Sequence, residues 1–466
     1  MGGNQLMKNS KVLTNYFDNV PINPMHLRLI FLVGIAYFFD IADNYNFGFI
    51  SPILVKSWGI SLTQVGQINS IFFIGMFFGG LLGGVVSDKL GRKKGFLLSI
   101  FTFSTFSIIN GLAPNLSIFM LGRFFTGVGV ASLIIVATPY LLEMLPKDNR
   151  GKWQSIAVGA GCVAIPIIGA VVKLVIPLGS ESWRIVYFIG GLGLFVAILG
   201  VFWLKESPRW LVSQGRISEA EKIVEEITGQ KADLSNAENE LIEKSHAVKD
   251  LKEIFNKKNI RNTLVLLSIF SIGYPAAFIF INWGPTLFSL KGYSLEDTSL
   301  LTLFISFGMV IGPFLASLIS DKLGRKSSIV VIFTGAAILS IIFAFLSTKI
   351  AIIAVAVVIA TLLQANSPVT LAYLGELYPT NIRSTAVGVI YSIGRLTTAL
   401  VSVIVPVVNA KFGYIGVFAL MGSLLLITST ITGIWGVHTV GKSLEELNDK
   451  FKDAHHNDVY KKLAKS

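Results

Sequence analysis

Five charged residues interrupt stretches of sequence that are otherwise apolar: Asp40, Asp43, Arg123, Lys173 and Arg395. Such stretches are typical of membrane spans, because a helix of about 20 residues crosses the hydrocarbon core of a bilayer. A charge at the centre of a span costs roughly 2.5 to 3.5 kcal/mol on insertion scales, so it requires a partner, water or a function. We interpret Lys173 as an interfacial residue whose ammonium group reaches the membrane surface. Two acids and two arginines remain as candidates for chemistry.

Arg395 lies about ten residues into its apolar stretch and has no acid near it in sequence. A guanidinium in a water-filled cavity binds a carboxylate through two parallel hydrogen bonds, so this residue favours an anionic substrate. Polar and aromatic side chains from other apolar stretches are candidates for completing a substrate-binding site by hydrogen bonding or stacking. These candidates are Tyr391, Tyr373, Gln364, Asn282 and Trp283.

The composition requires a membrane environment, because 53% of the residues are hydrophobic and only 14% are charged. Twelve apolar stretches reach the length of a span. They cover residues 27–54, 64–87, 95–113, 116–142, 153–177, 183–204, 260–289, 298–320, 328–347, 350–375, 385–408 and 413–437. The sequence therefore predicts an all-α integral membrane protein with twelve transmembrane helices.

A repeat divides these helices into two groups of six. The hexapeptide DKLGRK occurs at residues 88–93 and again at 321–326, and the offset of 233 is half of the 466-residue chain. Glu143, Pro146 and Arg150 recur at the same offset as Glu376, Pro379 and Arg383. Two motifs at one offset indicate a tandem duplication, which is typical of two-bundle carriers.

The duplicated charged residues lie in loops, where they are candidates for a gate. Gly91 and Gly324 suit tight turns between helices, and Arg92 and Arg325 can bridge to Glu143 and Glu376. Contacts that form when one side of a carrier is closed and break when it opens act on its conformational equilibrium. The predicted gating residues are Asp88, Arg92, Glu143, Arg150, Asp321, Arg325, Glu376 and Arg383.

The net charge of +12 is concentrated in alternate loops, which is a topology signal rather than a sign of nucleic-acid binding. Both termini are therefore predicted to be cytoplasmic. We divide the chain into an N-terminal tail (1–26), a six-helix bundle (27–204), a linker with short helices (205–259), a second bundle (260–437) and a C-terminal tail (438–466). In the linker, Ser218 and Glu221 form a capping-box pattern for a helix that Gly229 would end. Cys162 is the single cysteine, which excludes an intramolecular disulfide.

Several motifs resemble those of the major facilitator superfamily. GVVSDKLGRK resembles its loop signature, and GRFFTGVGVA, PYLLEMLPKDNRGK, KESPRWL and GELYPTNIRSTAVG resemble the motifs of sugar porters and their relatives. The seventh span lacks the Gln-Gln pair of sugar porters. Its WGPTLF and KGYS, with YSIGRLTTAL around Arg395, resemble the branch of metabolite:proton symporters that includes niacin transporters and synaptic-vesicle-glycoprotein-like carriers.

The resemblance implies alternating access and a proton relay between an acid of the first span and Arg123. The first span can be aligned with the two acids of the family pattern in two registers. One places Asp43 on the first family acid and Asn46 on the second, which puts proton coupling in doubt unless Asp43 or Asp40 takes that role. The other makes Asp40 and Asp43 the pair. The distance to Ser51 and Pro52 favours the first register.

We therefore predict a monomeric carrier in the cell membrane that moves a small organic anion, such as a monocarboxylate or aromatic acid, together with protons. A sugar or polyol porter is the alternative within the same class, and a nutrient sensor on the same fold is an alternative from another class. The motifs of an enzyme, a metal site or a cofactor site are not found in the sequence.

Overall fold

The computed structural model describes residue 16 and residues 20–146, 150–234, 253–256, 259–378 and 380–438, without the side chains of residues 317–319, 321, 322, 380, 381, 383 and 384. Within these residues every regular element is a helix. Eleven helical segments of the described chain are long and apolar enough to cross a membrane. The last of them contains two helices joined by a kink at Gly413, so the described residues hold twelve spans, as the sequence predicts.

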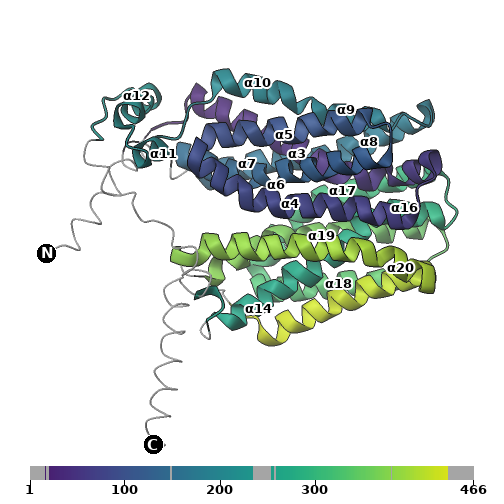
Figure 1. Cartoon of the computed structure of the whole chain (residues 1–466). Helices are drawn as coiled ribbons and strands as arrows, with labels where there is room; N and C mark the ends of the chain where they lie inside the picture. The colour runs from purple at the N-terminus through teal and green to yellow at the C-terminus, as the bar shows by residue number, and fades with distance from the viewer. Residues whose placement is uncertain are drawn as a thin grey trace, which may run out of the picture. The chain divides into compact units, whose positions relative to one another are not determined.

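The chain separates into two units, Met1–Ser245 and His246–Ser466. The finer division into tails, bundles and linker stays a prediction. In the first unit six spans pack side by side, and two short helices lie at one end of the bundle (Figure 1). The spans are α3 (Pro24–Trp58), α4 (Leu62–Leu90), α5 (Arg92–Leu112), α6 (Leu116–Met144), α7 (Arg150–Cys162) with α8 (Ala164–Val175) and η2 (Ile176–Leu178), and α9 (Arg184–Gly191) with α10 (Gly193–Trp203); the short helices are α11 (Pro208–Ser213) and α12 (Ile217–Thr228).

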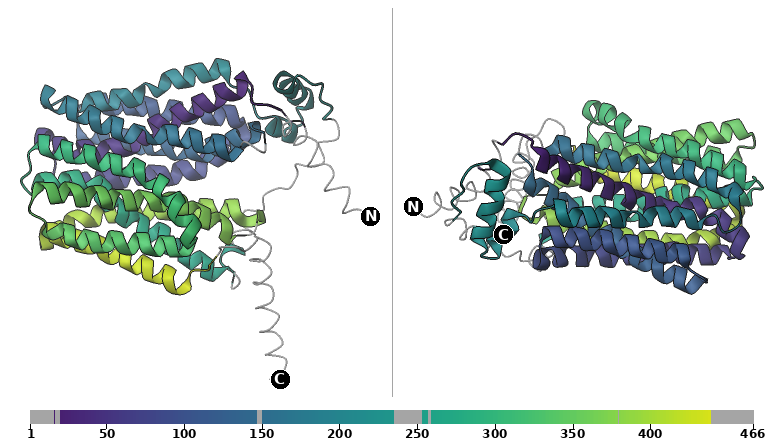
Figure 2. Two further views of the ribbon diagram at one scale, coloured as in Figure 1. Left: turned by 180° about the vertical axis from the view of Figure 1, so that it is seen from behind. Right: turned by 90° about the horizontal axis from the view of Figure 1, so that it is seen from above.

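The second unit also has six spans, and Figure 2 shows its helices from two further sides. Its first span includes two π-helical turns, a form of helix that is often found at functional sites. This span consists of α14 (Ile260–Ser268), η4 (Ile269–Gly273), α15 (Tyr274–Phe278), η5 (Ile279–Trp283) and α16 (Gly284–Leu290). The other spans are α17 (Leu295–Leu323), α18 (Arg325–Phe345), α19 (Lys349–Leu377) and the two arms of α20 (Thr380–Trp435).

The repeat extends to the closest helix contacts. A Cβ atom at Gly75 of α4 would lie 2.1 Å from the backbone oxygen of Phe124 in α6. Its counterpart at offset 233, Gly308 of α17, would bring a Cβ atom to 2.6 Å from the backbone oxygen of Val357 in α19. Real Cβ atoms do not approach backbone this closely, so glycine allows the same helix pair to cross tightly in both units.

The short helix of the linker begins differently from the prediction. Helix α12 starts at Ile217 after Arg216, and Ser218 lies inside its first turn, so the predicted Ser218 cap is wrong. The carboxylate of Glu221 instead accepts a hydrogen bond from the backbone N–H of Leu234 (2.9 Å). Gly229 ends the helix in a left-handed conformation (φ 71°), as predicted.

Candidate transport site

A buried acid–arginine pair lies in the first unit. Asp43 of α3 and Arg123 of α6 approach to 3.4 Å between Oδ2 and Nη1, and their side chains are 0% and 1% exposed. The Arg123 guanidinium also lies 4.0 Å from the ring centroid of Phe72, a distance at which a cation is attracted to an aromatic face. Because arginine stays protonated in proteins, Asp43 is the member of the pair that can take up and release a proton.

Two polar side chains hold the Asp43 carboxylate in place. Asn46 donates a hydrogen bond from Nδ2 to Asp43 Oδ1 (2.9 Å), and Ser107 of α5 donates from Oγ to the same oxygen (3.0 Å). The Ser107 hydroxyl lies at 3.0 Å from the backbone oxygen of Tyr187 as well. These neighbours stabilise the ionised acid, while Ser107 has a second acceptor when the acid is protonated.

Asp40 is buried one helical turn before Asp43, at 2% exposure. Residues three apart on a helix share a face, and Tyr37 continues that face toward the start of α3. The Tyr37 hydroxyl lies 3.0 Å from Oγ1 of Thr138, which also accepts a hydrogen bond from Gln154 Nε2 (3.4 Å). Polar groups therefore extend from the buried acids toward the end of the bundle where α3 begins.

The second unit places Arg395 beside aromatic rings. The Arg395 guanidinium carbon lies 4.4 Å from the ring centroid of Tyr391, and Nη2 donates a hydrogen bond to the Tyr391 hydroxyl. Tyr391 contacts the ring of Phe270, which stacks on Tyr274 with centroids 5.0 Å apart and planes 2° from parallel. A cation next to stacked rings suits a planar, negatively charged ligand.

Asn282 and Trp283 lie in η5, farther along the span that contains Phe270 and Tyr274. They line a cavity between the first span of this unit and the first arm of α20, which we call the seam cavity. Its lining residues are Pro275, Phe278, Ile279, Asn282, Trp283, Thr398, Val401 and Ser402.

Tyr373 and Gln364 are not grouped with Arg395 in this way. The Tyr373 hydroxyl donates to the backbone oxygen of Val437 (3.0 Å) and accepts from its N–H (2.8 Å). Tyr373 of α19 therefore holds the chain that follows α20 in place. Gln364 lies half-buried in the middle of α19.

Charged residues meet at the end of the first unit that carries the DKLGRK loop. Arg92 contacts the carboxylate of Asp88 (2.5 Å), that of Glu143 (3.4 Å) and Oγ of Ser87 (3.0 Å). Gly91 between α4 and α5 has a left-handed backbone (φ 106°). Arg150 donates from Nε to the backbone oxygen of Leu145 (2.8 Å), which caps the end of α6.

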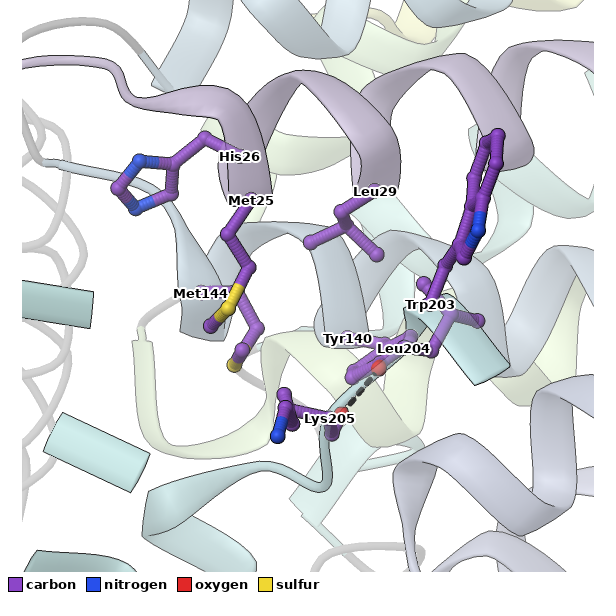
Figure 3. A pocket seen from close by; sticks show the side chains of 8 residues that line it. All are labelled: Met25, His26, Leu29, Tyr140, Met144, Trp203, Leu204 and Lys205. Carbon is purple, nitrogen blue, oxygen red and sulfur yellow. Dashed lines mark hydrogen bonds between the residues drawn. The ribbon is translucent and has the colours of Figure 1, made fainter. Parts of the chain in front are cut away.

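The KESPRWL segment, which joins α10 to α11, is hydrogen-bonded to the DKLGRK loop. Ser207 donates a 2.5 Å hydrogen bond to Glu143, Glu206 accepts from the backbone N–H of Lys93 (3.0 Å), and Trp210 donates from Nε1 to the backbone oxygen of Asp88 (2.8 Å). Figure 3 shows a neighbouring pocket in which the Tyr140 hydroxyl donates to the backbone oxygen of Lys205. The segment is therefore hydrogen-bonded both to predicted gating residues and to α6.

The second unit repeats the arginine contacts. Arg325 lies 3.3 Å from the Glu376 carboxylate and donates to Oγ of Ser320. Ser87 and Ser320 are themselves 233 residues apart, so the serine before each DKLGRK belongs to the repeated arrangement. The side chains of the two other predicted gating residues, Asp321 and Arg383, lie outside the described part of the structure.

Sequence reasoning missed several neighbours of these groups. Ser107, Phe72 and Tyr274 resemble the many other serines and aromatic residues in spans, and only the packing of the helices brings them to the charged side chains. Ser87 and Ser320 could have been found, because the repeated motif extends by one residue to SDKLGRK.

Comparisons with known proteins identify the family and the fold of the chain. Residues 31–451 match the family model described as sugar (and other) transporter. YyaJ of Bacillus subtilis (strain 168), named as a metabolite transport protein, is 32% identical over 92% of this chain and 96% of its own. The niacin transporter NiaP of Acinetobacter baylyi (strain ATCC 33305 / BD413 / ADP1) is 28% identical over 93% and 99% of the two chains.

A 4-hydroxybenzoate transporter, PcaK of Pseudomonas aeruginosa, is 26% identical over 83% of this chain and 86% of its own. The xylose transporter XylE from E. coli, in a partially occluded inward-open structure, shares the fold with a TM-score of 0.73 at 18% identity, over 90% of this chain and all of that one. The chain is a multi-pass membrane transporter of small molecules and not an enzyme, and it belongs to the sugar (and other) transporter family of the major facilitator superfamily.

Proposed function

We propose that this protein is a proton-coupled transporter of a small aromatic carboxylate that works by alternating access in the cell membrane. The observation that carries the proposal is the position of Arg395 beside Tyr391 and the stacked pair Phe270 and Tyr274. A guanidinium binds a carboxylate with two hydrogen bonds, and stacked rings favour a flat ligand. The names of two relatives, a niacin transporter and a 4-hydroxybenzoate transporter, support this substrate class.

The proton would be carried by Asp43, with Asp40 in support. When Asp43 is ionised it pairs with Arg123, and when it is protonated the pair is lost, so the proton changes the interactions between α3 and α6. A charge change of this kind biases a carrier between two conformations when the states differ in how they hold the acid. The burial of the pair supports this role, because burial strengthens an electrostatic interaction.

The gates would be the two arginine clusters, Arg92 with Glu143 and Arg325 with Glu376, on the cytoplasmic side. Their duplication supports a role in the movement common to both bundles, whereas Asp43, Arg123 and Arg395 have no charged counterpart at offset 233. The unpaired charges would then carry the substrate and proton chemistry.

A ligand screen on the purified protein tests the substrate class. Because a ligand that binds only the folded state at 100 times its Kd stabilises that state by about 2.7 kcal/mol, nicotinate, benzoate and 4-hydroxybenzoate should raise the melting temperature, and Arg395→Lys should abolish most of the rise. Xylose and myo-inositol should have no effect. Stabilisation by the sugars alone would establish the sugar or polyol porter instead.

A further inference from the structure

We propose that the seam cavity recognises a hydrogen-bond acceptor on the ring of the substrate, at the end away from the carboxylate. The inference rests on the proposed function, in which Arg395 binds that carboxylate. Asn282 and Trp283 are the residues that would select among aromatic acids.

Two residues that line the cavity carry buried donors that lack partners among the described residues. Nδ2 of Asn282 and Nε1 of Trp283 make no hydrogen bond there, and the two residues are 3% and 2% exposed. An unpaired buried donor costs about 1–3 kcal/mol, and folded proteins retain few of them. Two such donors on neighbouring residues that line one cavity therefore point to a ligand group that accepts their hydrogen bonds.

The hydroxyl groups on the opposite wall already donate their hydrogens to the backbone of α20. Oγ1 of Thr398 donates to the backbone oxygen of Gly394, and Oγ of Ser402 donates to that of Thr398, both at 2.8 Å. The N–H groups of Asn282 and Trp283 are therefore the donors that the cavity offers. The complementary group is an acceptor, such as a ring hydroxyl oxygen or a pyridine nitrogen.

The register of the two helices links the seam cavity to Arg395. Phe270 contacts Tyr391, and Tyr274 lies within electrostatic range of Arg395, so residues 121 apart in sequence face each other in both pairs. The cavity continues this parallel seam toward higher residue numbers, with Thr398 and Ser402 following Arg395 on one face of α20.

The distance along the seam suits a single small ligand. Thr398 and Ser402 lie three and seven residues after Arg395, which is about 5–10 Å along a helix. This is the size of a benzoic acid that carries a substituent on the far side of its ring. In this state the cavity is too narrow for a water molecule, so the acceptor would enter as the two helices move apart. The π-helical turns η4 and η5, a form of helix often found at functional sites, lie in one of these two helices.

Isothermal titration calorimetry on the purified full chain tests the inference with benzoate, 4-hydroxybenzoate and nicotinate. The wild-type protein should bind the two acceptor-bearing acids about 3- to 10-fold more tightly than benzoate, the value of one net hydrogen bond. Asn282→Leu and Trp283→Phe should each reduce this preference while changing benzoate affinity by less than about twofold. Trp183→Phe is the matched control, because Trp183 Nε1, in the other unit, is also buried without a hydrogen-bond partner among the residues that the structure describes.

The outcomes separate this inference from the proposed function. If none of the acids binds, or if Arg395→Lys leaves their affinities unchanged, the proposed function fails. If the acids bind through Arg395 but the wild-type protein does not prefer an acceptor on the ring, the inference is overturned even if neither seam variant folds. It is also overturned if Asn282→Leu or Trp283→Phe folds and lowers the affinity for benzoate as much as the affinity for the other two acids.

Discussion

Tyr140 of α6 and Tyr373 of α19 are 233 residues apart, and each binds the backbone just beyond the last span of its own unit. The Tyr140 hydroxyl donates to the backbone oxygen of Lys205, two residues after α10. The Tyr373 hydroxyl bonds the backbone of Val437, two residues after α20. The duplication therefore preserves a structural contact as well as the motif residues, and it fixes the chain where it leaves each bundle.

Removing either hydroxyl should lower stability. Tyr140→Phe should lower the free energy of unfolding by about 1 kcal/mol, because one hydrogen bond to a backbone carbonyl is lost. Tyr373→Phe should lower it by about 1–2 kcal/mol, because the bonds to both the carbonyl and the N–H of Val437 are lost. Thermal unfolding of the purified protein measures the effect. The hydroxyls of Tyr187 and Tyr414 are buried without a hydrogen-bond partner in the described residues, so Tyr187→Phe and Tyr414→Phe are matched controls that should be neutral or stabilising. Equal losses in all four variants would contradict the assignment.

Much of the fold follows from the sequence alone. Apolar length specifies the twelve spans, and the 233-residue offset of DKLGRK specifies two equivalent units. The contact of Arg92 with Glu143 could be expected, because both belong to the repeated motifs. The break at Gly413 lies at the predicted boundary between the spans 385–408 and 413–437. The π-helical turns η4 and η5 do not follow from apolar length, because they depend on local packing.

The candidate sites were predicted in part. The charge of Asp43, Arg123 and Arg395 stands out in apolar spans because a lone charge there is costly. The residues around them do not stand out. The sequence predicts Tyr373 as a substrate residue because of its polar ring, but its hydroxyl is hydrogen-bonded to the backbone of Val437. Which ring faces a cavity is decided by helix rotation, which a single sequence does not report.

The glycine contacts between helices should be intolerant of a methyl group. Gly79→Ala would place a Cβ atom 2.2 Å from the backbone oxygen of Val128, and helix backbones cannot move apart without loosening neighbouring contacts. We expect a loss of about 1–3 kcal/mol in the free energy of unfolding, as for overpacked cores. Gly84→Ala on the same helix is the control, because its nearest neighbour would be at 3.8 Å. Equal melting temperatures for the two variants would show that α4 and α6 do not pack this closely.

The arginine clusters should control the closed state of the cytoplasmic side. Arg92→Ala removes contacts to Asp88 and Glu143, and Arg325→Ala removes the contact to Glu376, so each should shift the population toward the inward-open state. Spin labels on cysteines at Lys94 and Leu323, in a Cys162→Ala background, should report longer distances. Substrate affinity should change by only a few-fold.

An arginine on the same side of the first unit provides the control. Arg216 pairs with Glu219 at 2.5 Å on an exposed surface of the linker, and exposed pairs of this kind contribute little. Arg216→Ala should leave the distance distribution unchanged. If Arg92→Ala and Arg325→Ala also leave it unchanged while folded, these residues are not part of a gate.

The orientation of the chain can be tested by labelling from one side of the membrane. Lys56 lies in the last turn of α3 and Lys291 follows α16, so the loop charges predict that both are outside, whereas Lys326 at the start of α18 is predicted to be inside. Single cysteines at Lys56 and Lys291 in intact cells should react with an impermeant maleimide, and one at Lys326 should react only after permeabilisation. The opposite pattern would place both termini outside.

Proton coupling should depend on Asp43. Asp43→Asn keeps a polar group of the same shape but cannot take up a proton, so exchange of labelled for unlabelled substrate in proteoliposomes should persist while accumulation driven by a pH gradient is lost. The variant also leaves the Arg123 charge buried without its partner, which costs about 3–5 kcal/mol, so a fall in melting temperature is expected. Asp43→Asn combined with Arg123→Gln removes both charges and should recover much of that stability without recovering accumulation.

Two further variants, at the surface acid Asp297 and at the buried acid Asp40 next to Asp43, serve as comparisons. Asp297 pairs with Lys349 at the surface of the second unit, and Asp297→Asn should accumulate substrate like the wild-type protein. Asp40→Asn should slow accumulation if Asp40 passes the proton between Asp43 and the start of α3. If Asp43→Asn and Asp40→Asn both still concentrate substrate against its gradient, neither acid carries the proton. Asn46, which one register places where proton-coupled relatives have their second acid, would then indicate facilitated diffusion.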